Sequence, residues 1–469
     1  MTVIIASFVF FMLIFLGVGV YSATRKKNTD DDYLVAGRDV GPWAMALSAV
    51  ASNNSGYMFI GLIGLTFNEG LTALALMGGW VVGDYTAWIL GIPKALRKRS
   101  EETGTLTIPS LLGHGIDGGR IVVLVAGLIV LVFLGAYSAA QLIAGGKALH
   151  VLFGWNPNVG AVIGAAIVVI YCFAGGIRAS IWTDVAQSTV MVVAMNLLLF
   201  VGVYEAGGPS ALWDRLAAID PQLVSFAPAS LPFGFGLFLL GWFAAGFGVV
   251  GQPHLMVRAM TLESTDKMAV ARRVYVVWNA LFTLSAVGVG LVARVLLSES
   301  TGFDPELAMP MLSKELLSPV LVGLVLAGIF AATMSTADSQ VLSCAAAVTQ
   351  DIAPRPELGN RYTKLGTILV TAVVLMIALR GGSVFVLVIL AWSGLAASLG
   401  PLLVVRCLGG RPHCVTAIAM MVVGFLAALG WGQYGMGYSV GLNEALPGMV
   451  AGFAIYGIGK AVAGKSPAV

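Results

Sequence analysis

Three carboxylates stand well inside long apolar runs of this sequence, at Asp84, Asp184 and Asp338. A charge at membrane depth is costly, so such residues mark ion or solute pathways by default. Ser335, Asp338 and Ser339 follow an i, i+3, i+4 pattern, which places their side chains on one helix face. Hydroxyl and carboxylate oxygens are the ligands that hard cations prefer. The spacing therefore predicts an ion or proton site on this helix.

Each of these carboxylates also has a purely structural interpretation. Asp84 stands among aromatic residues and can simply cap or pair within a helix bundle. Asp184 follows Gly175 and Gly176 and can serve as a helix-start carboxylate at the positive end of the helix dipole. Hydroxyls in membrane helices often bond back to their own backbone, so serine residues alone are weak evidence for an ion site.

Catalytic chemistry of other kinds finds no support in the residue spacing. The cysteines lack CxxC spacing and are interpreted as small packing residues, and the histidines have no HExxH or triad companions. Residues 246–251 match G-x-G-x-x-G, but a dinucleotide site needs a preceding strand and a βαβ unit. We interpret these glycines as a helix break, with close helix packing as the alternative. An enzyme is therefore disfavoured.

The composition sets the class of protein that must position these residues. Of 469 residues, 58% are hydrophobic and 10% are charged, whereas soluble domains carry roughly 25% charged residues. Such a chain cannot cover itself with a water-facing surface, which excludes a soluble enzyme, a disordered chain and a nucleic-acid-binding protein. What remains is a polytopic protein whose main partner is the lipid bilayer.

Apolar runs long enough to cross a ~30 Å hydrocarbon core recur along the whole chain. They are continuous, whereas a barrel would need alternating segments of about ten residues, so the fold class is all-α. The first run lacks a basic n-region and is expected to be a spanning helix rather than a signal peptide. About thirteen spans are predicted: 3–23, 43–67, 72–93, 120–151, 159–177, 180–204, 233–257, 272–297, 317–347, 363–380, 383–407, 414–431 and 441–462.

Basic residues predict the orientation of these spans. The clusters at 25–27, 94–99, 267–273 and 355–364 fall on one side if the helices alternate, and about 21 of the 26 Lys and Arg residues lie there. Since basic loops stay in the cytoplasm, an odd number of crossings places the N-terminus outside and the C-terminus in the cytoplasm.

Two of the predicted helices are interrupted at mid-membrane. One break is polar, at residues 51–56, and the other is glycine-rich, at residues 246–253. If the first helix is set aside, each broken helix is the first member of a set of five helices. Paired discontinuous helices at matching positions are a pointer to a transporter's binding site, because unwinding frees backbone groups that lipid cannot satisfy.

Several spaced motifs resemble the sodium:solute symporter family, most closely its bacterial sodium/proline symporter branch. The resemblance covers roughly residues 30 to 405. It rests on Tyr33–Arg38, Ala51–Gly56, Gly175–Gly176 with Trp182–Asp184, Gly251–His254 with Arg258, Met334–Thr336 and Ala391–Gly394.

The resemblance implies a single transmembrane transporter domain with a five-plus-five inverted-repeat (LeuT-like) core and alternating access. The core repeats are expected at about 43–204 and 233–407, and the flanking helices at about 3–23, 414–431 and 441–462. The implied function is sodium-coupled symport of a small polar organic solute, such as proline, another amino acid or a small carboxylate, in the cytoplasmic (inner) membrane. Sodium is the implied coupling ion, without an organic cofactor.

The resemblance also implies site residues. The main sodium site would use the carbonyls of Ala51, Asn54 and Ala332 and the hydroxyls of Ser335 and Thr336. A possible second cation or proton site falls on Asp184, Ser335, Asp338 and Ser339. The implied solute contacts are Asn53, Ser55, Gly56, Tyr137, Gln141, Phe247 and Val249.

Two departures from the family pattern bear on coupling and specificity. The proline branch usually has an aspartate where this chain has Asn53, and a small polar residue where it has Asp338. One hypothesis is that the carboxylate has moved to the facing helix, where Asp184 and Asp338 share a cation or a proton. Aromatic walls of the proline pocket fall on Ala245 and Val249, which suggests a larger or differently shaped solute. The alternative is a slightly shifted alignment, in which Trp242, Phe243 or Phe247 restores one wall.

These departures leave rival functions open. Proton coupling through Asp184 and Asp338 is the nearest alternative. A transporter-like sensor domain is another, and it is disfavoured because no soluble module follows Lys460. Paired breaks fit gated occlusion better than an open channel.

Overall fold

The computed structural model describes residues 1–25, 27, 29–297, 302–355, 358–433 and 442–463. Across these residues the regular structure is helical, apart from one isolated bridge between Val40 and Leu262. The predicted all-α class is confirmed. The long helices are α1 (Thr2–Ala23), α5 (Thr72–Ile89), α8 (Gly119–Phe153), α9 (Pro157–Glu205), α13 (Met268–Leu296), α15 (Pro319–Ala346), α16 (Asn360–Ala378), α17 (Val384–Cys407), α18 (Cys414–Gln433) and α19 (Ala445–Ala463).

Ten of the described helices are long and apolar enough to cross a membrane, or eleven if α5 and α6 (Ile92–Thr103) form one bent span. The predicted count of about thirteen is higher for two local reasons. The run 43–67 divides into two short helices, and the apolar helix Pro157–Ile170 is itself too short to qualify. The count of thirteen therefore stays a prediction.

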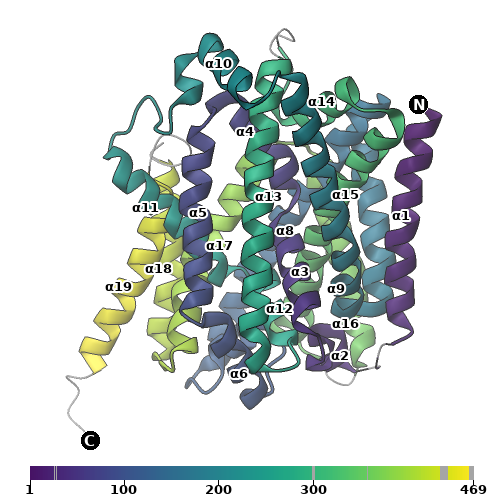
Figure 1. Cartoon of the computed structure of the whole chain (residues 1–469). Helices are drawn as coiled ribbons and strands as arrows, with labels where there is room; N and C mark the ends of the chain where they lie inside the picture. The colour runs from purple at the N-terminus through teal and green to yellow at the C-terminus, as the bar shows by residue number, and fades with distance from the viewer. Residues whose placement is uncertain (26, 28, 298–301, 356–357, 434–441, 464–469) are drawn as a thin grey trace, which may run out of the picture.

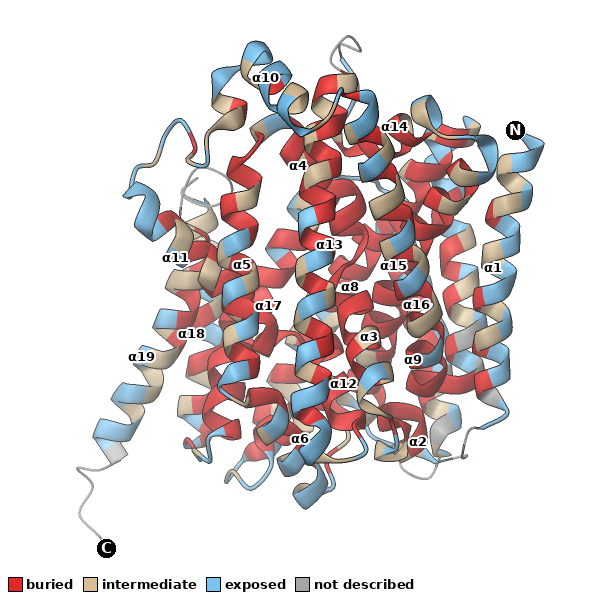
Figure 2. Ribbon diagram, in the orientation of Figure 1, coloured by how far each residue is buried: buried red, intermediate tan, exposed pale blue. Residues whose placement is uncertain are grey.

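The bundle has a buried centre and a lipid-facing rim (Figures 1 and 2). α15 and α17 are buried over most of their length, whereas α1 and α19 lie at the edges with apolar side chains exposed. The N-terminus and the end of α19 lie at opposite ends of the bundle, and the basic helix α6 lies at the α19 end together with α2 (Asp30–Val35) (Figure 1). This arrangement agrees with the clustering of basic residues on one side.

Both predicted helix breaks are present. α3 (Pro42–Asn53) stops before Asn54, and a π-helical turn, Tyr57–Gly61, leads into α4 (Leu62–Glu69). The end of α3 leaves its last carbonyls without intrahelical partners, as at any helix C-terminus. These carbonyls lie in the buried centre of the bundle, where other polar groups must satisfy them.

The second break joins α11 (Gly234–Phe247) to α12 (Pro253–Thr261) through the 3₁₀ turn Gly248–Gly251. Proline at the first position of α12 starts a new helix but cannot continue the previous one. A Cβ atom on Gly246 would lie 1.9 Å from the carbonyl oxygen of Trp80. The glycines therefore serve close packing as well as the break.

α9 is interrupted at Gly176, which has φ 58° and ψ −145°, a conformation open essentially to glycine alone. A Cβ atom there would lie 2.5 Å from the backbone oxygen of Tyr33 in α2. The break lets α2 pack against α9 without a side chain between them.

We expect Gly176→Ala to destabilise the protein by at least about 2 kcal/mol, because strain of this kind costs roughly 1–3 kcal/mol and the clash with Tyr33 adds to it. The measurement is the apparent Tm of detergent-purified protein. Gly78→Ala is the matched control, since a Cβ on this helical glycine meets nothing within 4 Å. An unchanged Tm for Gly176→Ala would contradict the prediction.

Candidate functional site

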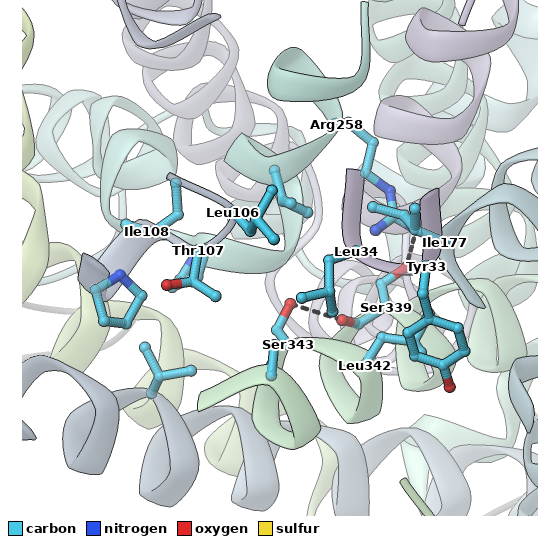
Figure 3. A pocket seen from close by; sticks show the side chains of 15 residues that line it. Tyr33, Leu34, Leu106, Thr107, Ile108, Ile177, Arg258, Ser339, Leu342 and Ser343 are labelled. Atoms are coloured by element: carbon cyan, nitrogen blue, oxygen red, sulfur yellow. Dashed lines mark hydrogen bonds between the residues drawn. The ribbon is translucent and has the colours of Figure 1, made fainter. Parts of the chain in front are cut away.

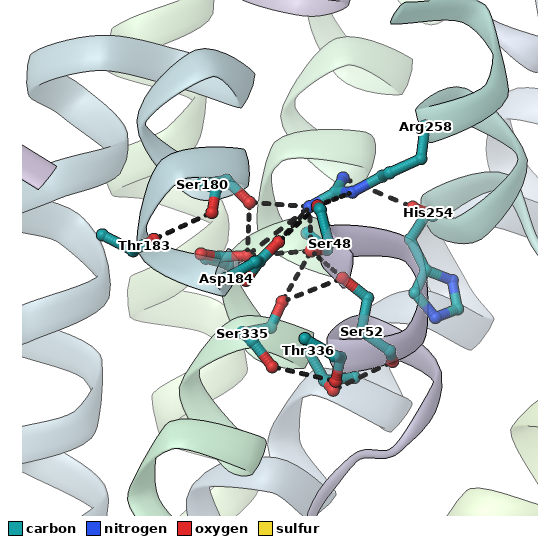
Figure 4. A network of polar contacts seen from close by, with 12 residues as sticks. Ser48, Ser52, Ser180, Thr183, Asp184, His254, Arg258, Ser335 and Thr336 are labelled. Carbon is teal, nitrogen blue, oxygen red and sulfur yellow. Dashed lines mark hydrogen bonds and ion pairs between the residues drawn. The ribbon is translucent and has the colours of Figure 1, made fainter. Parts of the chain in front are cut away.

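The hydroxyls of α15 meet the broken end of α3 in the centre of the bundle (Figure 4). Ser335 Oγ donates to the carbonyls of Ala51 and Ala332, at 3.0 and 3.2 Å. Thr336 Oγ1 donates to the carbonyl of Ser52 at 3.0 Å. All five residues are buried. The structure therefore brings together four of the five residues predicted to form the main sodium site.

The fifth predicted ligand, Asn54, is the C-cap of α3, where φ −82° and ψ 64° turn the backbone out of the helix. Ala51 and Ser52 belong to the last turn of α3, so the helix itself supplies no donor for their carbonyls. Hydroxyls from the facing helix satisfy them instead. Neutral carbonyl and hydroxyl oxygens are ligands suited to a hard monovalent cation. We call this cluster the α3–α15 oxygen site.

A charged cluster lies beside the α3–α15 oxygen site, where α12, α9 and α15 meet (Figure 4). Arg258 Nη2 donates to Ser180 Oγ at 2.6 Å and to Ser339 Oγ at 2.5 Å. It lies 3.4 Å from Asp184 Oδ2 and 4.0 Å from Asp338 Oδ1. The three charged side chains are completely buried. One guanidinium therefore lies between two carboxylates.

Hydroxyl groups hold both carboxylates in place. Ser48 Oγ donates to Asp184 Oδ2 at 2.6 Å, and Ser180 and Ser339 donate to Asp338 Oδ1 at 3.0 and 2.8 Å. The predicted common face of Ser335, Asp338 and Ser339 thus points into one polar cluster. With both carboxylates ionised, the three charged groups would sum to −1, which favours a further cation or proton.

Sequence reasoning placed Arg258 only in a family motif and did not predict that it lies between Asp184 and Asp338. The available signal was its position in the second half of a broken helix, since a basic residue at membrane depth requires an acidic partner. The earlier structural interpretation of Asp184 as a helix-start carboxylate is not what the structure shows. Asp184 lies eight residues beyond the Gly176 break, in the interior of the second part of α9 and past its first turn.

A small central cavity lies beside the break in α3 and is mainly lined by aromatic and amide side chains. Its volume, about 10 Å³, leaves room for about one water molecule, so a solute requires its walls to move apart. The lining residues are Asn53, Asn54, Tyr57, Met58, Met77, Trp80, Tyr137, Asn279, Val388 and Trp392.

Some of the predicted solute contacts gather at this cavity and others do not. Asn53 and Tyr137 line it, and Ser55 Oγ lies 3.3 Å from Tyr137 Oη. The amide of Gly56 donates to Gln141 Oε1 at 2.8 Å, which ties the break to α8. Phe247 and Val249 are not among the residues that line this cavity.

Aromatic residues from other helices lie near the pocket wall where the sequence has Ala245 and Val249, and the sequence did not place them there. The ring of Trp80 lies 4.8 Å from that of Trp392 and 6.1 Å from those of Tyr57 and Trp242, measured between centroids. Trp392 Nε1 donates to the carbonyl of Ala245 at 2.7 Å. The tryptophans that line the cavity therefore come from α5 and α17, and Trp242 of α11 stacks on Trp80 outside the lining. The signals in the sequence were a tryptophan in the middle of each apolar run and, for Trp392, its place in the motif Ala391–Gly394.

Two further cavities flank the centre. On the N-terminal side, Lys147 bridges Asp304 and Glu306, at 2.7 and 2.5 Å, beside a cavity of about 490 Å³. Phe385 lines that cavity and stacks at 5.7 Å on Tyr57 of the central one. These two rings thus lie between the cavity on the N-terminal side and the central cavity.

On the opposite side of the bundle, a cavity reaches the charged cluster (Figure 3). It is lined by residues that include Tyr33 and Leu34 of α2, Thr107, Ser343, and both Arg258 and Ser339. The charged cluster therefore borders a cavity on the side of the basic loops.

Comparisons with known proteins agree with this geometry. A sequence model of the sodium:solute symporter family matches residues 33–424. The osmoregulated proline transporter OpuE of Bacillus subtilis (strain 168) is 30% identical, over 99% of this chain and 96% of its own length. The sodium/proline symporter of Escherichia coli (strain K12) is 31% identical, over 92% and 88%.

Two solved structures share the fold. A Na+-coupled sialic acid symporter, in a substrate-bound outward-open state, superposes with a TM-score of 0.81 at 21% identity, over 98% of both chains. The nucleobase-cation-symport-1 family transporter Mhp1, in a closed conformation with bromovinylhydantoin bound, gives a TM-score of 0.61 at 17% identity, over 94% of this chain and 96% of its own. The predicted transporter fold is confirmed.

Proposed function

Because this chain belongs to the sodium:solute symporter family, we propose that it carries proline or a closely related small amino acid into the cell. It is a multi-pass membrane protein that transports a solute together with sodium, and it is not an enzyme. The choice of solute is supported by relatives named as proline transporters at about 30% identity over nearly the whole chain. The aromatic and amide lining of the central cavity suits a small amino acid once its walls move apart.

We propose that the α3–α15 oxygen site binds the coupling sodium through the carbonyls of Ala51, Asn54 and Ala332 and the hydroxyls of Ser335 and Thr336. The observation that carries this assignment is the cross-bonding of α15 hydroxyls to α3 carbonyls that lack helical partners. A cation there would tie the first broken helix to α15. Because it would bind best when the two helices are close, it would favour one conformation and so couple ion to solute.

We assign the charged cluster of Asp184, Asp338 and Ser339, with Ser335 beside it, to a second cation or to a proton. Asp184 and Asp338 are both fully buried and both lie near the Arg258 guanidinium. With both carboxylates ionised these three charged groups sum to −1, which favours one further positive charge. Proton coupling through this pair is the second candidate function.

The entry of one sodium ion provides about 2.3 kcal/mol per 100 mV of membrane potential, which is enough for more than tenfold accumulation of the solute.

We place the protein in the cytoplasmic (inner) membrane with its N-terminus outside and its C-terminus in the cytoplasm. The support is the concentration of basic segments at one end of the bundle, the end that α19 approaches (Figure 1). The core repeats at about 43–204 and 233–407 remain part of this proposal.

Uptake into proteoliposomes tests the function directly. The protein is reconstituted and given labelled proline, other amino acids or small carboxylates, one at a time. Each is supplied with an inward sodium gradient, with choline replacing sodium, or with a proton gradient at fixed sodium. We expect proline accumulation with sodium and little with choline. Uptake that follows the proton gradient and ignores sodium would support the rival coupling. Accumulation of no amino acid or small carboxylate under any gradient would contradict the transporter assignment.

A further inference from the structure

A third buried carboxylate, Asp84 of α5, lies against the broken end of α3. Its Oδ2 accepts hydrogen bonds from Asn53 Nδ2 at 3.2 Å, Tyr275 Oη at 2.7 Å and Asn279 Nδ2 at 3.2 Å. The residue is 1% exposed. The pairing within the bundle expected from the sequence is therefore present, and it is made with the one residue of the break that departs from the proline branch.

No basic side chain forms an ion pair with Asp84 among the described residues. A buried carboxylate without a countercharge is costly to keep. Such a residue inside a span is a functional candidate.

The two amides bonded to Asp84 also line the central cavity. A carboxylate only accepts hydrogen bonds, so Asn53 and Asn279 must turn their nitrogens towards Asp84 and their oxygens away from it. Both side chains line the cavity together with Trp80 and Trp392, whereas Asp84 lies behind them. Amide oxygens, aromatic faces and a negative charge behind them suit a positively charged nitrogen.

Asp84 contacts one face of α3, and the α3–α15 oxygen site lies on a different face of the same helix. Ser52 lies 3.0 Å from Ser339 of α15, measured between hydroxyl oxygens, while the next residue, Asn53, points to α5 and α13. Successive residues of a helix are about 100° apart around its axis, at 3.6 residues per turn. The charge of Asp84 is therefore directed to the solute cavity rather than to the hydroxyls of α15.

We propose that Asp84 is a positioning residue that gives the solute cavity its preference for a positively charged nitrogen. It holds the amides of Asn53 and Asn279 with their oxygens available to the solute and supplies the negative charge behind them. It thereby places a carboxylate, from α5, against the α3 position where the proline branch carries an aspartate and this chain has Asn53. Asp338, the carboxylate on the facing helix α15, lies in the charged cluster near Arg258 and stays assigned to the shared cation or proton. This inference rests on the proposed function.

The test compares proline with two analogues that each lack one of its charges. Cyclopentanecarboxylate keeps the ring and the carboxylate without the nitrogen, and pyrrolidine keeps the charged nitrogen without the carboxylate. In the wild type we expect proline and pyrrolidine, but not cyclopentanecarboxylate, to compete for labelled proline uptake. In Asp84→Asn the KM for proline should rise at least tenfold, while the sodium concentration for half-maximal uptake changes less than twofold.

Moving the charge back to α3 separates a charge effect from a structural one. The double variant Asp84→Asn with Asn53→Asp should recover most of the lost affinity for proline, because the carboxylate returns to the cavity wall. Asp266→Asn, in an exposed turn, is the control for removing an acidic residue. Apparent Tm values show whether each variant is folded.

Several results would overturn the inference. One is a shift in the sodium requirement of Asp84→Asn with an unchanged KM for proline, and another is a folded double variant that recovers nothing. If the wild type transports no proline, the proposed function fails separately. Ligand-induced Tm shifts with amine-bearing solutes and their deaminated counterparts then test Asp84 alone, and equal shifts for both classes would overturn it.

Discussion

Removal of the Ser335 and Thr336 hydroxyls together should raise the sodium concentration for half-maximal uptake by at least a hundredfold. The two hydroxyls donate to α3 carbonyls that have no partner within their own helix. A cation bound at this place would be coordinated by oxygens of both α3 and α15. A lost ligand that costs about 1.4 kcal/mol weakens binding tenfold, and two such losses multiply if they are independent.

The double variant Ser335→Ala with Thr336→Ala is measured for proline uptake over a range of sodium concentrations. Thr371→Ala is the control, since it removes another buried hydroxyl that donates to a backbone carbonyl, within α16. It should leave the sodium requirement unchanged. A double variant that is folded and still shows the wild-type sodium requirement would exclude the α3–α15 oxygen site.

Replacement of Arg258 by methionine should cause the largest loss of stability among the charged residues. The guanidinium is fully buried between Asp184 and Asp338, and its replacement removes the positive charge that both carboxylates face there. Breaking a buried pair in this way costs about 3–5 kcal/mol. We expect a markedly lower apparent Tm and little transport for Arg258→Met.

Neutralising one carboxylate should reverse part of this loss. The double variant Arg258→Met with Asp338→Asn buries one charge fewer, so its apparent Tm should lie above that of Arg258→Met alone. Additive effects of the two substitutions would contradict the electrostatic interpretation, because interacting charges give non-additive changes.

Asp338→Asn alone tests the second cation or proton. Asparagine can still accept the hydrogen bonds from Ser180 and Ser339, so the fold should persist while the charge is lost. We expect the sodium dependence or the pH dependence of uptake to change. If both stay as in the wild type, Asp338 carries neither ion.

The sequence by itself determined the class of protein, the helix positions and the two breaks. The low content of charged residues and the continuous apolar runs are local properties, and they follow from the thickness and polarity of the bilayer. The common face of Ser335, Asp338 and Ser339 was equally predictable, because it depends only on 3.6 residues per turn within one helix.

The local properties of the sequence did not determine which helices contact one another. Arg258 between Asp184 and Asp338, Asp84 behind Asn53, and the tryptophans at the cavity all join segments far apart in the chain. Apolar runs reveal little about which faces turn towards one another, because lipid and protein interiors accept the same side chains. Only the packed bundle decides which buried charges meet, and with that it decides which of them face the ion and which face the solute.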